Sequence, residues 1–375
     1  MKLVKLLLFS TSIFCFSLAS TAQDIHFSMF DLAPTMMNPA NTGAFLGSIR
    51  VGALHRDQWG QSGADFVTTS LYADSPVLAI GKKKRDWIGV GMSVLRDVAG
   101  RERNSLQPYL ETTFAIPSVS IHKVLDKKGD NIFTFGVQGG AVNRTLHVDG
   151  LFLQENIATS LGGGGVTGGF NGTEAGTFRG KQQDNGENIN QINFTDFSTG
   201  IRFRSKVSKS TEIIVGGAIA HVVKLRNYSF TTGAGGRDTT GMANPADNDS
   251  VNKRPSTFRA HFSVNHELSD KLNFYPSAFF QTTKGLTETF VQANVGYEMS
   301  KDLELIGGVG FRLANAGSIS AGVNFKDWTI RMAYDANFGQ VATARLQNTF
   351  EVGAMYIIKI YQEPVVDPVI LCPKF

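Results

Sequence analysis

Apolar and polar residues alternate with a period of two along most of this chain. Residues 257–265 illustrate the pattern, because Phe258 and Phe262 fall on one face while Arg259 and His261 fall on the other. The face with Arg259 and His261 would be unfavourable in the core of a soluble protein, because these side chains need water. This pattern predicts strands that have one apolar face and one polar face.

The alternation recurs in segments of roughly ten residues and predicts about 14 strands, an even number as expected for bacterial barrels. No stretch after residue 22 approaches the roughly 20 apolar residues of a membrane helix, so a membrane would be crossed by strands. We therefore predict an all-β fold, a transmembrane antiparallel β-barrel. The strands are expected near residues 48–57, 65–73, 87–95, 107–122, 131–142, 193–204, 212–223, 257–265, 271–282, 287–298, 303–313, 317–325, 328–335 and 350–359.

A soluble β-sandwich also alternates apolar and polar positions, and three features favour the membrane barrel over it. The apolar faces carry almost no charge, as a hydrocarbon environment requires. Short links alternate with long ones, and the two longest insertions, 143–191 and 229–255, are rich in Gly, Asn, Thr and Asp. Aromatic residues gather near strand ends, where membrane interfaces lie; examples are Trp59, Tyr72, Trp87, Tyr275, Tyr297, Trp328, Tyr334, Tyr356 and Tyr361.

The N-terminus is typical of a secretory signal peptide at residues 1–22. Lys2 and Lys5 precede an apolar core, and Ser20 and Ala22 suit a cleavage site that would leave Gln23 first. We predict four regions: the signal peptide, a periplasmic lead-in or plug at 23–46, the barrel at 47–361, and a proline-containing tail at 362–375. Export places the barrel in the outer membrane, where long loops face outside and short turns face the periplasm.

Composition narrows the range of functions. The chain has 40 Gly, 28 Phe and only 11 Pro, which favours strands joined by turns. Its net charge of +4 is spread without a basic block, so we expect no nucleic-acid partner. Cleavage of the signal peptide removes Cys15 and leaves Cys372 as the only cysteine, which excludes an internal disulfide.

Motifs of catalysis or of cofactor binding are weak. Residues 163–168 formally match G-x-G-x-x-G but lack the strand and helix that a phosphate site needs. His266-Glu267 has no second histidine at helical spacing, and the nucleophile elbow G-x-S-x-G is absent. We predict no catalytic, cofactor or metal site, although an outer-membrane hydrolase could assemble a site from loops distant in sequence.

The segment before the first strand combines turn residues with apolar anchors. Asn38-Pro39-Ala40 and Asn41-Thr42-Gly43 favour turns, while Phe27, Phe30, Met36 and Met37 could pack against other residues. Such a segment could plug the barrel, or it could be a lead-in that covers the periplasmic mouth.

Several motifs at the two ends of the chain resemble the PorP/SprF family of type IX secretion system outer-membrane proteins. The chain departs from this pattern at 143–191, where the insertion is long. The matching residues are Gln23-Asp24, Phe27-Ser28, the block Met37-Asn38-Pro39-Ala40 with Gly43, Arg56 followed by Gln58-Trp59, and the ending Cys372-Pro373-Lys374-Phe375.

This resemblance implies a non-enzymatic role in protein secretion. The implied partners are the outer-membrane bilayer, other type IX components and the C-terminal sorting domain of large, gliding-type adhesins. A passive porin or solute transporter is the alternative that the same alternation permits. Candidate partner-binding residues are Phe27, Asn38, Pro39, Ala40, Gly43, Arg56, Gln58, Trp59, Cys372, Pro373 and Phe375.

Overall fold

The computed structural model describes the barrel and the segment that precedes it. The predicted signal peptide, the predicted tail with Cys372, and most of the two predicted insertions lie outside this part of the chain. The described residues are 27–59, 65–81, 85–101, 109–147, 191–222, 255–284, 286–313, 316–338 and 348–360.

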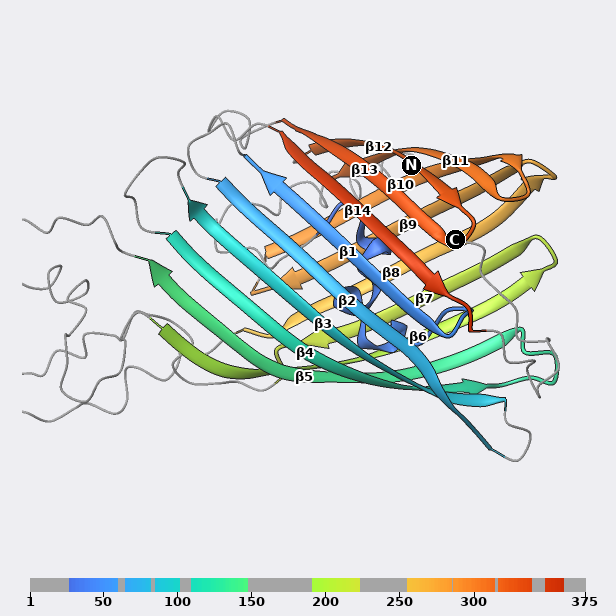
Figure 1. Ribbon diagram of the computed structural model, residues 1–375, viewed down its shortest axis with the longest axis horizontal. Coiled ribbons are helices and arrows are strands. Elements are labelled where there is room, and N and C mark those ends of the chain that lie inside the picture. Colours follow the sequence, from blue (N-terminus) through green and yellow to red (C-terminus); the bar gives the residue numbers. More distant parts are fainter. Residues whose placement is uncertain are drawn as a thin grey trace, which may run out of the picture.

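Fourteen antiparallel strands form one closed barrel, in which the first strand pairs with the last (Figure 1). This confirms the predicted fold and the predicted strand number. The strands are β1 (Ile49–Gln58), β2 (Asp65–Ile80), β3 (Asp86–Arg101), β4 (Tyr109–Val124), β5 (Asn131–His147), β6 (Gln191–Ser208), β7 (Thr211–Ala220), β8 (Thr257–Ser269), β9 (Leu272–Thr283), β10 (Leu286–Ser300), β11 (Leu303–Arg312), β12 (Ala316–Phe325), β13 (Trp328–Asn337) and β14 (Thr349–Ile358).

The side chains alternate between the outside and the lumen of the barrel as predicted. In β13, Ile330 and Met332 are exposed outside, whereas Arg331 and Ala333 are buried inside. The exposed face is apolar around the circumference, with Leu71 on β2, Phe135 on β5 and other large residues on most strands. A surface of this kind is stable when hydrocarbon surrounds it.

The two ends of the barrel differ in the length of their connections. At one end, which we call the turn end, β6–β7, β8–β9, β10–β11 and β12–β13 are each joined by two residues. The other end, which we call the loop end, carries the long connections 148–190 and 221–256. Every odd-numbered strand therefore runs from the turn end to the loop end.

Strands β5 and β6 extend into the first predicted insertion, so that insertion is shorter than predicted. Their ladder continues through Asn143↔Asn193 to Thr145↔Gln191. A transmembrane strand needs only about 9–11 residues, so these polar positions belong to a part of the ladder that lies beyond the hydrocarbon and tolerates polar side chains.

Residues 27–48, which we call the plug segment, lie inside the barrel ahead of β1 (Figure 1). They contain three single turns: η1 (Phe30–Leu32), α2 (Pro34–Met37) and η2 (Pro39–Asn41). In the described part of the chain, no helix has the length and apolar character that a membrane-spanning helix requires.

The plug segment corrects one expectation about the polar faces of the strands. Those faces were expected to need water, yet Ser120 is 1% exposed and Glu351 is 0% exposed. Their partners come from the plug segment and from neighbouring strands, because a second piece of the chain occupies this part of the lumen.

A cation on the outer face should destabilise the barrel. Met332 is 52% exposed outside, in the middle of β13. We expect Met332→Arg to lower the free energy of unfolding in phospholipid vesicles by about 2–4 kcal/mol, the cost of arginine at the bilayer midplane. Denaturant titration followed by tryptophan fluorescence would measure it. Met332→Leu is the matched control and should stay close to wild type.

Candidate functional site

The plug segment is the candidate site, because its buried contacts join strands that are far apart in sequence. At the loop end, the carboxylate of Glu351 on β14 accepts hydrogen bonds from the backbone N–H groups of Ser28 at 2.8 Å and Met29 at 2.9 Å. Arg56 on β1 donates to the same carboxylate at 2.6 Å. Glu351 therefore fixes the backbone of the plug segment to the seam where the barrel closes.

A second group of charges holds the same stretch from the neighbouring strands β10, β11 and β13. The hydroxyl of Ser28 donates to Asp335 on β13 at 2.5 Å and accepts from Arg312 on β11 at 2.8 Å. Arg312 also pairs with Glu288 on β10 at 2.8 Å. One serine hydroxyl thus connects the plug segment to an acid and a base of the barrel wall. We call the contacts of Ser28 and Met29 with Glu351, Asp335 and Arg312 the loop-end latch.

Apolar contacts surround the latch. Phe30 stacks on Phe279 at a centroid distance of 5.6 Å and meets the edge of Phe290 at 6.1 Å. A larger cluster joins the plug segment to the inward apolar residues of six strands. Its buried members are Phe27, Met29, Leu32, Ala33, Leu54, Leu95, Phe114, Val142, Ala333 and Met355.

The Asn38-Pro39-Ala40 turn lies at the centre of the site. The Asn38 side chain is fully buried; its oxygen accepts from the N–H of Ala40 at 2.9 Å, which closes the turn. Its amide nitrogen donates to the carbonyl of Ile201 on β6 at 2.9 Å and lies 3.2 Å from Nε2 of His261 on β8. Proline at the first helical position suits such a turn, since its missing N–H would have no partner there.

Inward glycines make room for this turn. A Cβ atom on Gly136 of β5 would lie 2.4 Å from the backbone of Pro39 and Ala40, and one on Gly200 of β6 would lie 2.1 Å from the Asn38 side chain. Only glycine lets the wall approach the plug backbone this closely. The wall and the turn are thus complementary in shape.

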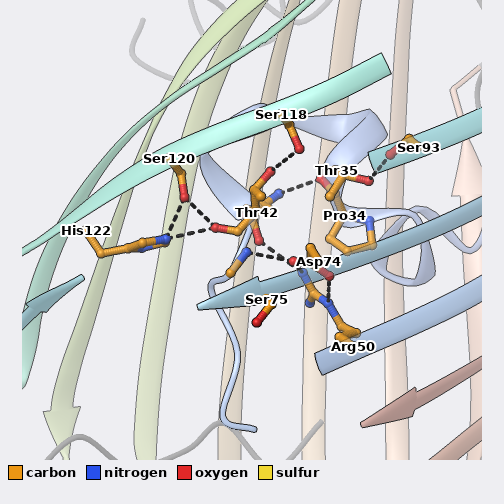
Figure 2. Close-up of polar contacts among 12 residues, drawn as sticks. Pro34, Thr35, Thr42, Arg50, Asp74, Ser75, Ser93, Ser118, Ser120 and His122 are labelled. Atoms are coloured by element: carbon orange, nitrogen blue, oxygen red, sulfur yellow. Dashed lines mark hydrogen bonds and ion pairs between the residues drawn. The ribbon is translucent and has the colours of Figure 1, made fainter. Parts of the chain in front are cut away.

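The plug segment leaves the lumen at the turn end through another charged contact (Figure 2). Arg50 on β1 makes a bidentate pair with Asp74 on β2, at 2.9 and 2.7 Å, and also donates to the carbonyl of Asn41 at 3.0 Å. Asp74 accepts in turn from the N–H of Gly43 at 2.7 Å. Gly43 has φ +65° and packs on Gly89, so this position favours glycine.

Strand β4 holds the next turn of the plug through Thr42. Its carbonyl accepts from Ser120 at 2.5 Å and from Nε2 of His122 at 2.8 Å, while its hydroxyl donates to Ser118 at 2.9 Å (Figure 2). Trp87 on β3 donates to the carbonyl of Gly43 at 3.0 Å. The backbone carbonyls of Thr42 and Gly43 therefore both have hydrogen-bond donors inside the lumen.

The structure brings some of the predicted site residues together and separates others. Phe27, Asn38, Pro39, Ala40 and Gly43 all belong to the plug segment, and Arg56 reaches it through Glu351. Gln58 and Trp59 lie at the loop end of β1, where Trp59 packs edge-on against Phe66. Cys372, Pro373 and Phe375 lie outside the described residues.

Sequence reasoning did not select the wall residues that hold the plug segment. The period of two in the predicted strands 328–335 and 350–359 puts Asp335 and Glu351 on the polar face, and a carboxylate that is buried on such a face needs a partner. Their partner could not be found from sequence alone, because Ser28 and Glu351 are 323 positions apart.

Within the residues that the structure describes, no group of three or more His, Cys, Asp or Glu side chains is arranged to hold a metal ion. Many of the ion pairs and hydrogen bonds of the lumen hold the plug segment, and others, such as Arg204–Glu212, join neighbouring strands.

The sequence model of the family described as type IX secretion system membrane protein PorP/SprF matches residues 19–356. The chain belongs to the PorP/SprF family. Its membership makes it a membrane component of type IX secretion, and this component is built as a closed β-barrel. Both facts are consistent with a protein that is not an enzyme. No curated protein sequence matches this PorP/SprF chain.

Solved barrels similar to this PorP/SprF protein include the toluene transporter TbuX of Ralstonia pickettii, at TM-score 0.49 and 13% identity over 91% of this chain and 96% of that chain. A Pseudomonas aeruginosa FadL homologue has TM-score 0.44 and 16% identity over 86% and 94%. The toluene transporter TodX of P. putida has TM-score 0.46 and 10% identity over 86% and 93%.

Removing the central carboxylate of the latch should destabilise this PorP/SprF barrel. Glu351→Ala removes the carboxylate that pairs with the buried Arg56, and with it the acceptor of two backbone N–H groups. We expect a loss of about 3–5 kcal/mol in the free energy of unfolding, measured by denaturant titration in vesicles. The control is Arg96→Ala, which breaks a pair whose arginine side chain is 54% exposed and should cost no more than about 1 kcal/mol.

A larger residue at Gly136, where the barrel wall contacts the plug backbone, should displace the plug segment. Gly136→Val would place a branched side chain on the backbone of Pro39 and Ala40, so we expect higher ion conductance in planar bilayers than wild type. Gly307→Val is the control, because a Cβ at Gly307 meets nothing within 4 Å. Equal conductance of wild type and Gly136→Val would contradict this account of the plug.

Proposed function

We propose that this protein is an outer-membrane component of type IX secretion that assists the secretion and surface anchoring of large, gliding-type adhesins by binding their C-terminal sorting domain. The observation that carries the proposal is family membership over residues 19–356, combined with a barrel whose lumen holds a plug. In this proposal the protein anchors a client and carries out no catalysis.

The arrangement of the plug supports selective binding over free diffusion. Residues from Ser28 to Thr42 are held by buried contacts with β13 and β14 beside the seam, and with β4, β6 and β8 farther around the barrel. A passive porin requires a wide aqueous path, and a plug held this firmly opposes one. Single-channel conductance separates the two functions, since a steady open pore in the purified wild type favours transport.

The loop end is the side on which the proposed client would dock. The two longest connections, 148–190 and 221–256, join β5 to β6 and β7 to β8. These four strands are neighbours in the barrel, so the two connections begin and end side by side at the loop end. Loops on a rigid scaffold are where binding residues concentrate. The latch at Ser28 also lies at this end, so client and plug would share one side of the barrel.

The test is gene deletion followed by proteomics of the cell surface and the medium. We expect large adhesins with a C-terminal sorting domain to disappear from the surface, and the wild-type gene to restore them. An unchanged surface proteome would reject the proposal. A direct test is pull-down of a fluorescent protein fused to one such sorting domain by the purified barrel, with the unfused fluorescent protein as control.

A further inference from the structure

All buried arginines of the described lumen form ion pairs, with one exception. Six arginines are buried among the described residues, and five of them form ion pairs. The five pairs are Arg50–Asp74, Arg56–Glu351, Arg204–Glu212, Arg312–Glu288 and Arg331–Asp31. The sixth is Arg202 on β6, which is 5% exposed and has neither a hydrogen bond nor an ion pair with any residue in the described ranges.

The position of Arg202 explains its burial. Its ladder partners are Thr134 on β5 and Gly216 on β7. Gly200 lies on the same face, two residues nearer the loop end, and the Asn38 side chain packs against it. Arg202 therefore lies on the turn-end side of the Asn38-Pro39-Ala40 turn, and the plug segment separates it from the loop end.

The charges around Arg202 leave an excess of one cation. The groups that act on it electrostatically are Glu212, Arg204 and Arg50. Glu212 is already bound to Arg204, and Arg50 is neutralised by its bidentate pair with Asp74. A buried cation without a counter-charge is strongly unfavourable in proteins.

The two nearby histidines supply no negative charge. His261 and His122 both feel the charge of Arg202. Nε2 of His261 accepts from the amide of Asn38, and Nε2 of His122 donates to the carbonyl of Thr42. Glu212, which is paired with Arg204, is therefore the one carboxylate among the groups that act on Arg202 in the described part of the chain.

We propose that the turn-end half of the lumen binds a small oxyanion, a phosphate or carboxylate group, against Arg202. The planar guanidinium presents paired N–H donors that match two oxygens of such a group. The ligand supplies the counter-charge that the protein lacks at this position, just beneath the turn that anchors the plug segment. A free anion and a lipid headgroup share this chemistry.

The full-length mature protein, purified in a neutral detergent and dialysed free of phosphate, provides the test. The apparent unfolding temperature is measured at one scan rate with inorganic phosphate, with acetate, and with phosphatidylglycerol in mixed micelles, each against chloride at equal ionic strength. We expect at least one oxyanion to raise the wild-type value by about 2–4 °C at roughly ten times its dissociation constant. A response to phosphate or acetate identifies a free anion, and a response to phosphatidylglycerol alone identifies a headgroup.

Variants then assign the response to Arg202. Arg202→Gln should lose the shift, whereas Arg96→Gln, at an exposed pair on the outer surface, should keep it. Glu212→Gln removes the carboxylate that acts on Arg202 and should enlarge the shift. The proposal is overturned if wild type responds to none of the three anions or if Arg202→Gln responds as fully as wild type. Where Arg202→Gln does not fold, Arg202→Lys takes its place: a smaller shift supports the site, and an undiminished shift overturns it.

Discussion

The need to pair every backbone N–H and C=O inside hydrocarbon determines this structure. A lipid-facing sheet edge would leave such groups without partners, so the first and last strands must pair. They do so over the whole length of β1, from Ile49↔Ile358 to Gln58↔Thr349. Closure with 14 strands creates a lumen wider than the eight-stranded barrels whose inward side chains just fill the interior. The plug segment is the piece of chain that occupies this extra space.

The fold could be predicted because lipid and lumen impose a period of two. That period distinguishes Met332 from its neighbour Arg331 without knowledge of any partner, and it located all 14 strands. Strand ends were harder to predict. Beyond the bilayer the outward face need not be apolar, so the continuation of β5 to His147 carries no periodic signal.

The site could be predicted only in part. The turn chemistry of Asn38 and Pro39 is local and was visible in the sequence, and the structure contains that turn. The path of the plug segment was not visible, because single turns of three or four residues have no periodicity. Its partners are also distant in sequence, as the pairing of Thr42 with Ser118 and of Ser28 with Glu351 illustrates.

The contacts of the plug segment differ in kind from those of the barrel. Strand ladders hold the barrel, and each ladder bond joins one strand to its neighbour. The plug segment is held by side chains such as Glu351 and Asn38, and its own backbone enters the ladder only where Ser48 donates to Ile358 at 2.8 Å. Removing the plug would leave every strand pair intact, but it would expose the apolar cluster around Met29 and the buried ion pair of Glu351 to water. The barrel and the plug thus depend on different interactions: strand pairing inside the membrane holds the barrel, and buried side chains of the lumen such as Glu351 hold the plug.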